Sequence, residues 1–277
     1  MKRALTVIAY VLMFLAIQSV VSIIVTFVYA LVRGDLQGGL PVEGTLITML
    51  VFSLLTIAVF ILFKWYVPVT TYVRTRPLSV LTWCIIAALG ALAPSLFLQE
   101  LLMPAWPEWI QQIVDETNQQ FSLIMTTRGG YFVVALLAPV TEEVVFRGAV
   151  LGYLLKSRHS AIIAVVVSAL LFALAHLNPA QMPHAFLIGL LLGWLYLRTG
   201  SILPGIIYHW ANNTAAYIMF HLYPDPDATL SDIVGGGTGN TLLAVAFSLC
   251  IFLPAIYQLH LRMPRGTGMS ELPRAEV

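Results

Sequence analysis

Three ionisable side chains, Glu142, Glu143 and Arg147, lie within an apolar stretch of the sequence and could take part in chemistry. Placing a charged side chain inside a membrane costs roughly a few kcal/mol, so such residues are candidates for a functional site. On a helix, Glu143 and Arg147 are one turn apart and can form an ion pair. Glu142 points about 100° away from Glu143 and stays outside that pair. We therefore interpret Glu143 and Arg147 as structural, and Glu142 as free for chemistry.

Two histidines and an asparagine are the other polar groups that could join Glu142. His176 lies one turn after Phe172, and His209 lies one turn before Asn213. A single histidine on an apolar helix face is more often structural than chemical. Ionisable groups inside a membrane must, however, face one another or water, which favours their convergence on one site.

These residue types suggest hydrolysis of an amide bond. A glutamate whose pKa is raised by apolar surroundings can act as a general base toward water, and His176 beside Glu142 could orient that water. His209 and the Asn213 amide could donate hydrogen bonds to an oxyanion. Glu142, His176 and His209 also resemble the two-histidine, one-glutamate shell of catalytic zinc. We favour a site without a metal or other cofactor, because Asn213 is a poor zinc ligand, and keep zinc as the alternative.

Other protease designs find little support in the sequence. The zinc-protease pattern His-Glu-x-x-His and the serine pattern Gly-x-Ser-x-Gly are both absent. Every aspartate falls in an expected loop, which leaves no intramembrane aspartate pair. A transporter that uses Glu142 as a proton relay is also disfavoured, because the sequence contains no repeated halves.

The composition indicates a multi-pass integral membrane protein. Of the 277 residues, 59% are hydrophobic and only 10% are charged, compared with roughly 25% charged in soluble proteins. The lipid bilayer is therefore the expected environment, either in the cell membrane or, in a eukaryote, the endoplasmic reticulum. The net charge of +1 suggests no nucleic-acid partner.

The hydropathy pattern predicts an all-α fold with about eight transmembrane helices in one domain, residues 1–262, followed by a disordered cytosolic tail, residues 263–277. Most of the apolar stretches are close to the ~20 residues that a bilayer requires, although the fifth and sixth are short. We expect the third to be kinked at Pro94. The expected spans are 4–32, 46–67, 78–103, 130–155, 160–177, 183–197, 201–221 and 240–261.

The charges of the loops predict that both termini are cytosolic. Basic residues favour the cytoplasmic side, and the loops alternate between basic and acidic along the chain. Between the third and fourth spans, residues 104–128 combine an apolar stripe with tryptophans, which predicts a helix in the outer membrane interface. A packed structural loop is an equally good interpretation. The basic loop residues are Lys2, Arg3, Lys64, Arg74, Arg76, Lys156, Arg158, Arg198, Arg262, Arg265 and Arg274.

Three spaced motifs resemble the CPBP family, which comprises CAAX prenyl endopeptidases and bacteriocin-processing or abortive-infection proteins. They are Glu-Glu-x-x-x-Arg at 142–147, Phe-x-x-x-His at 172–176 and His-x-x-x-Asn at 209–213. The resemblance covers about residues 130–220. It implies eight helices around a conical cavity open to the cytosol. It also implies that Glu142 activates water with His176, that His209 and Asn213 stabilise the oxyanion, and that the substrate is a lipidated tail, a leader or a signalling peptide.

We therefore predict an intramembrane endopeptidase that acts on a membrane-associated protein or peptide. The alternative is a non-enzymatic immunity or scaffold protein that keeps the motifs for structure. The expected depths of these residues in the membrane conflict with a shared site. Counting ~1.5 Å per residue from the cytosolic face places Glu142 and His209 at a depth of about 12 Å, and His176 at a depth of about 24 Å. We expect the motif to hold and the boundary of the fifth span to be wrong.

Overall fold

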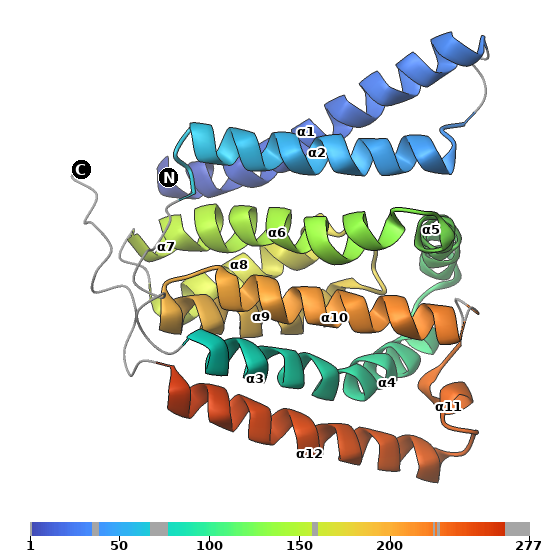
Figure 1. Cartoon of the computed structure of the whole chain (residues 1–277), viewed down its shortest axis with the longest axis vertical. Coiled ribbons are helices and arrows are strands. Elements are labelled where there is room, and N and C mark those ends of the chain that lie inside the picture. Colours follow the sequence, from blue (N-terminus) through green and yellow to red (C-terminus); the bar gives the residue numbers. More distant parts are fainter. Residues whose placement is uncertain are drawn as a thin grey trace.

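The structure, a computed structural model, describes residues 2–34, 39–66, 77–156, 160–223, 225 and 228–263. All regular secondary structure in these residues is helical, which confirms the predicted all-α class. The tail expected to be disordered, residues 263–277, lies outside the described residues apart from Met263. Most helices run side by side in Figure 1, and α1 begins at the same end of the bundle at which α12 ends.

Helices are present at the places of all eight expected spans. The fourth is a continuous helical run in which α-helix and π-helix alternate, formed by Phe132–Leu137 (π), α6 (Ala138–Glu142), Glu143–Leu151 (π) and α7 (Gly152–Lys156). The third span is split into two helices. The remaining helices are α1 (Lys2–Arg33), α2 (Val42–Leu62), α3 (Pro77–Gly90), α4 (Leu92–Leu102), α5 (Glu108–Thr126), α8 (Ala161–Ala175), α9 (Met182–Thr199), α10 (Leu203–Leu222), α11 (Leu230–Ile233) and α12 (Thr238–Arg262).

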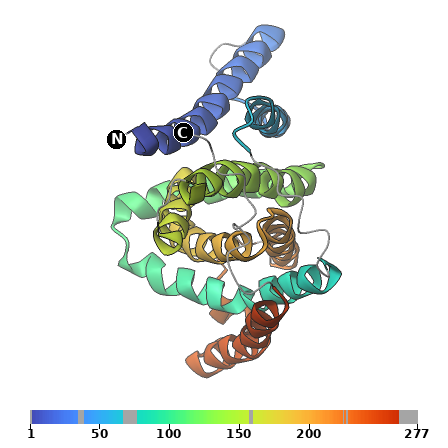
Figure 2. The ribbon, with the colours of Figure 1, turned by 90° about the vertical axis from the view of Figure 1, so that its left-hand side faces the viewer.

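Four helical segments of the described chain are long and apolar enough to cross a membrane: Leu5–Arg33, Val42–Leu62, Leu78–Ala105 and Thr238–Arg262. The protein is therefore an integral membrane protein. The other four expected spans form the middle of the bundle, where α8 has only 15 residues and α10 carries several polar side chains. Seen end-on in Figure 2, α1 and α2 lie on one side of this middle part and α12 lies on the other.

The third expected span breaks between α3 and α4, before Pro94 rather than at it. Proline cannot donate a backbone hydrogen bond, and its ring clashes with the carbonyl four residues earlier, here that of Gly90. Gly90 also packs against the backbone of α12, where an added Cβ would lie 2.6 Å from the Phe252 nitrogen. Pro94 thus accounts for the break, and Gly90 permits the close contact at that point.

Helices α8 and α9 pack closely through two glycines on α9. A Cβ on Gly189 would lie 2.9 Å from the Ala169 Cβ, and a Cβ on Gly193 would lie 2.8 Å from Val165 Cγ1. Small residues four positions apart are typical of helices that approach closely in membranes. This spacing brings the carbonyl of Gly189 within reach of the residues on the fourth helical run.

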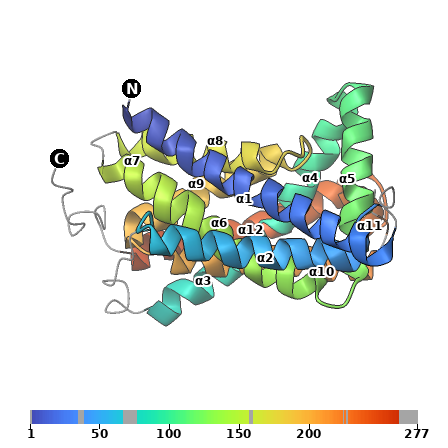
Figure 3. The same cartoon turned by 90° about the horizontal axis from the view of Figure 1, so that it is seen from above.

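Helix α5 crosses one end of the bundle. It is seen end-on in Figure 1 and along its length in Figure 3. One apolar flank is buried, with Ile110 and Val114 packed near Ala180, while Trp109 is 62% exposed. The predicted helix between the third and fourth spans is therefore present, and its place at a membrane interface stays a prediction.

The short helix α11 was not expected from the sequence. Its first turn is closed by a capping box, in which Thr229 Oγ1 accepts from the Asp232 N–H and Asp232 accepts from the Thr229 N–H. The Thr229 hydroxyl also donates to Asp232 Oδ2, and this hydrogen bond, together with that from the Thr229 N–H, lowers the pKa of the exposed Asp232 carboxyl. The pattern Thr-x-x-Asp was a usable signal for this helix.

The predicted topology can be tested with reporter fusions. Fusions after Arg76, Arg158 and Arg262 should report the cytosol, because basic loops are retained there. Fusions near Gln37, Gln119 and Asp227 should report the opposite side. A cytosolic signal at Gln119 together with an external signal at Arg158 would contradict this orientation.

Candidate active site

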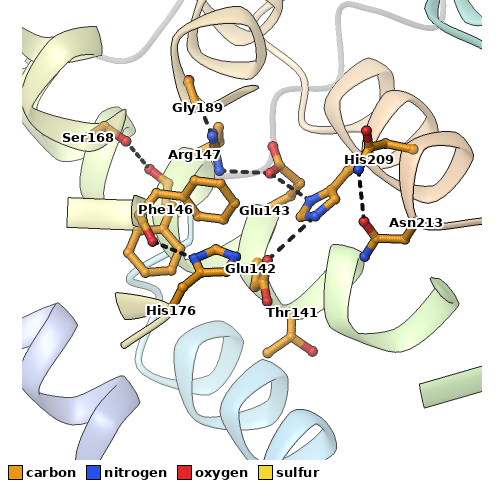
Figure 4. Close-up of polar contacts among 12 residues, drawn as sticks. Thr141, Glu142, Glu143, Phe146, Arg147, Ser168, His176, Gly189, His209 and Asn213 are labelled. Carbon is orange, nitrogen blue, oxygen red and sulfur yellow. Dashed lines mark hydrogen bonds and ion pairs between the residues drawn. The ribbon is translucent and has the colours of Figure 1, made fainter. Parts of the chain in front are cut away.

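The fully buried ion pair between Glu143 and Arg147 forms the centre of the site. Arg147 Nη1 lies 2.8 Å from Glu143 Oε1, and both side chains have no exposed surface. Arg147 Nη2 donates to the Gly189 carbonyl of α9 at 3.2 Å, and the guanidinium lies 4.3 Å from the ring centroid of Phe172 on α8. The pair expected from the sequence is present, and it joins three helices (Figure 4).

The carboxylate of Glu143 also faces the start of α10. A Cβ on Gly205, in the first turn of α10, would lie 2.5 Å from Glu143 Oε2, so only glycine leaves room there. A negative charge is stabilised near a helix N-terminus by the helix dipole. Glu143 is thus held between the Arg147 guanidinium and the N-terminal turn of α10.

Glu142 points away from this pair, toward a cavity. Its Oε2 atom lies 3.7 Å from His209 Nε2, while His209 Nδ1 lies 3.7 Å from Glu143 Oε1. The His209 ring therefore sits between the two carboxylates, as Figure 4 shows. Glu142 Oε2 is buried and accepts no hydrogen bond from the described part of the chain. The two adjacent glutamates therefore occupy different environments.

His176 caps the C-terminal end of α8 and points into the same region. Its Nδ1 atom lies 2.9 Å from the Phe172 carbonyl oxygen. Because a carbonyl can only accept, Nδ1 must carry the proton, which leaves Nε2 with a free lone pair. The Phe172 ring packs edge-on against His176 and His209, with centroids 4.8 and 5.8 Å apart, so this ring separates and orients both histidines.

Asn213 is oriented by the irregular backbone of the fourth helical run. In the first π-helical segment the Ala138 N–H donates to Val133, five residues back. The next residue, Pro139, has no N–H to give to Val134. The Val134 carbonyl accepts instead from Asn213 Nδ2 at 3.0 Å, and Asn213 Oδ1 accepts from Asn212 Nδ2. One N–H of the Asn213 amide remains for another acceptor.

The doubt about the boundary of the fifth span was wrong, because α8 begins and ends within two residues of the expected span. His176 and His209 nevertheless both pack against the Phe172 ring and line one cavity. The two histidines therefore meet, although counting residues along each helix places them at different depths.

A cavity of about 450 Å³ lies beside Glu142, and Phe172, His176, His209 and Asn213 also line it. It extends to Tyr223, Asp225 and Ile233, near α5 and α11. That end of the bundle is opposite to the end at which α1 begins (Figure 1). The cavity thus extends toward the end of the bundle that the loop charges place outside the cytosol, whereas the family resemblance implies a cavity open to the cytosol. A second cavity of about 200 Å³ adjoins Glu142 and His176 and reaches Phe14 of α1 and Phe52 of α2.

The choice between a metal-free site and a zinc site stays a prediction. Among the described residues, no group of three or more His, Cys, Asp and Glu side chains is arranged to hold a metal ion. His209 faces both glutamates, and one ring nitrogen of His176 contacts a carbonyl; histidines that bind zinc make contacts of the same kind with their second ring nitrogen. The two-histidine, one-glutamate set is thus brought to one cavity.

Two cavity residues were missed by the sequence analysis. His184, in the first turn of α9, had been given no role, and Asn212 was not singled out; both line the larger cavity. The residues next to them in the sequence gave only weak signs that they would line a cavity. Pro183 marks a helix start, which places His184 at the end of α9 nearest to His176.

Comparisons with known proteins bear on the region that carries this site. Residues 125–215 match the family described as Type II CAAX prenyl endopeptidase Rce1-like. An uncharacterised 24.3 kDa protein of Escherichia coli is 26% identical over 166 residues, which are 57% of this chain and 72% of that protein. No solved structure matches the chain.

A second relative carries a functional name. The membrane-embedded CAAX protease MroQ of Staphylococcus aureus (strain USA300) is 33% identical over 120 residues. The match covers 42% of this chain and 49% of that protein, so the chain spans about half the length of this relative. Residues 125–215, which match the Rce1-like family, include the three motifs that meet at the cavity. Through this region, the chain is similar to CAAX proteases.

Proposed function

We propose that this membrane protease is an intramembrane endopeptidase that hydrolyses a peptide bond in a membrane-associated protein or peptide. The observation that carries the proposal is the contrast between the adjacent glutamates. Glu143 is fully buried and paired with Arg147, whereas the Glu142 side chain is 21% exposed, lies 3.7 Å from His209 and lines the cavity. A structural role would leave such a carboxylate costly and unexplained.

In the proposed reaction, Glu142 takes a proton from a water molecule as that water attacks the carbonyl carbon of the substrate. His176 Nε2, free because Nδ1 donates to Phe172, accepts a hydrogen bond from the same water and orients it. The tetrahedral intermediate collapses when the C–N bond breaks. Glu142 then returns the proton to the leaving amine.

His209 and Asn213 stabilise the oxyanion that forms during the attack. The His209 ring lies between the two carboxylates, and a ring N–H of His209 can donate a hydrogen bond to a substrate oxygen in the cavity. Asn213 keeps one amide N–H for the same purpose, because only one is used on Val134. Because these donors are already in place, they need not reorient as negative charge develops on the substrate oxygen.

The proposal includes a membrane arrangement. The chain crosses the bilayer about eight times, with both termini in the cytosol and α5 in the outer interface. The helix bounds and the exposed Trp109 support this arrangement. In this proposal the site acts without a metal ion, because Glu142 can activate water directly.

The first expected outcome concerns Glu142. Replacing Glu142 with Gln should lower cleavage by about a hundred-fold or more, because the amide keeps the shape but cannot take a proton. The amount of protein in the membrane should stay near normal. Comparing membrane peptides from cells with either form should reveal a substrate that accumulates uncut only with Glu142→Gln. An unchanged peptide profile would favour the non-enzymatic immunity or scaffold role.

A second expectation concerns the ion pair. Glu143→Ala or Arg147→Ala should lower the free energy of unfolding by about 3–5 kcal/mol, because each leaves a buried charge without its partner. Thermal unfolding of the purified protein in detergent measures the loss. Glu108→Ala on the exposed face of α5 is the control and should change little. If Glu142→Gln destabilised the protein as strongly, Glu142 would be structural too.

The third expectation separates the carboxylate mechanism from a zinc mechanism. Cleavage by purified protein should survive treatment with a chelator, because no proposed step uses a metal ion. Elemental analysis of the same sample provides the metal content. Stoichiometric zinc, whose removal abolishes cleavage and whose return restores it, would overturn the metal-free site.

A further inference from the structure

The smaller cavity, of about 200 Å³, adjoins Glu142 and His176 between the fourth helical run and helices α1 and α2. We propose that this cavity is a water-holding site, which keeps water within reach of Glu142 while a substrate fills the larger cavity. The inference rests on the proposed function of the same site. The occupant is water, rather than a side chain of the substrate or an acyl chain of a lipid.

The walls of the smaller cavity combine polar groups from several helices. Five of the eleven described residues that line it have polar side chains: Gln18 of α1, Ser53 of α2, Thr141 and Glu142 of the fourth helical run, and His176 at the end of α8. Cavities that stay empty in proteins are apolar, whereas polar cavities hold water that hydrogen-bonds to their walls. One water molecule needs about 10–15 Å³ of such space, so this cavity has room for several.

Gln18 lies near the middle of α1, where a polar side chain is costly in a membrane. The helix runs from Lys2 to Arg33, and Gln18 is exposed on its surface. A polar group at this depth is expected to face a polar partner or water rather than lipid. Gln18 lines the smaller cavity, where water can donate to its amide oxygen and accept from its amide N–H groups. Water in the cavity therefore accounts for a glutamine at this position.

Ser53 and Thr141 provide hydroxyl groups deeper in the protein. They are 3% and 1% exposed, respectively. Thr141 Oγ1 donates to the Leu137 carbonyl at 2.9 Å, and a hydroxyl that donates in this way can still accept from water. Thr141 and Glu142 are neighbours in the chain and line the same cavity. Water bonded to the Thr141 hydroxyl is therefore close to the proposed base.

The two cavities meet at the groups that would activate water. Glu142 and His176 line both of them. A peptide bound in the larger cavity displaces water from it, yet each cleavage consumes one water molecule. The water oxygen bonds to the carbonyl carbon as the C–N bond breaks, and one proton passes through Glu142 to the leaving amine. Water stored in the smaller cavity reaches Glu142 without passing the bound peptide.

Radiolytic footprinting of the unmutated protein in phospholipid nanodiscs, without substrate, tests whether water occupies the cavity. Short X-ray pulses form hydroxyl radicals from bound water, and these radicals label the side chains that the water contacts. Phe14 is 5% exposed and lines the smaller cavity but not the larger one. Phe247 of α12 is 71% exposed and should face lipid. Phe14 should be labelled several-fold faster than Phe247, and labelling no faster than that of Phe247 would overturn the inference.

Substitutions on α1 and α2 test whether the labelling comes from this cavity. Ser53→Leu places a larger apolar side chain in the cavity, and Gln18→Leu, at an exposed position, is a second variant in case Ser53→Leu fails to fold. Each should lower the labelling of Phe14 several-fold. Ser19→Leu is the matched control, because Ser19 is exposed on α1 and lines neither cavity. Unchanged labelling in both cavity variants, or an equal loss in the control, would contradict the inference.

Turnover distinguishes a water store from a binding pocket for the substrate. The probe is an internally quenched, farnesylated peptide that ends in Cys-Val-Ile-Met. Ser53→Leu and Gln18→Leu should lower kcat several-fold and leave KM unchanged, because the smaller cavity supplies water and holds no part of the peptide. A raised KM with an unchanged kcat would show that the cavity binds substrate and would overturn the inference. If the unmutated protein failed to cleave the probe, the proposed function would be contradicted, and the labelling of Phe14 would still decide whether the cavity holds water.

Discussion

The arrangement of the site depends on the buried ion pair between Glu143 and Arg147. Two charges without exposed surface are tolerable only when each is paired and hydrogen-bonded. Arg147 meets this condition by reaching the Gly189 carbonyl and the Phe172 ring, while Glu143 lies against the first turn of α10. The pair thus fixes the fourth helical run against α8, α9 and α10, the helices that carry His176, His184 and His209.

Irregular backbone contributes as much to the site as the ion pair does. The π-helical segments free carbonyl groups that an α-helix would use internally. Asn213 donates to one of them, Val134, and Ser168 donates to another, Phe146. Each contact costs the helix a regular hydrogen bond and replaces it with a bond to a neighbouring helix. In a membrane this exchange is needed, because no solvent is present to satisfy a free carbonyl.

Much of the architecture was predictable from local patterns. Long apolar runs predicted helices at the places of α1, α2, α3 with α4, and α12, and the split of the third span follows from Pro94. The predicted pairing of Glu143 with Arg147 and the separate direction of Glu142 follow from helical geometry. The π-helical segments were not foreseen, because they depend on where freed carbonyls find donors. His184 was missed because its importance comes only from its distance to other helices.

The sequence by itself determined the class of protein, the helix order and the candidate residues for a hydrolytic site, because hydropathy and spacing along a helix are local properties. Only the tertiary structure decided how those residues meet. It showed that His209 lies between both glutamates and that two cavities share Glu142. These relations depend on the depth and tilt of separate helices, which are set by packing contacts between residues distant in the chain.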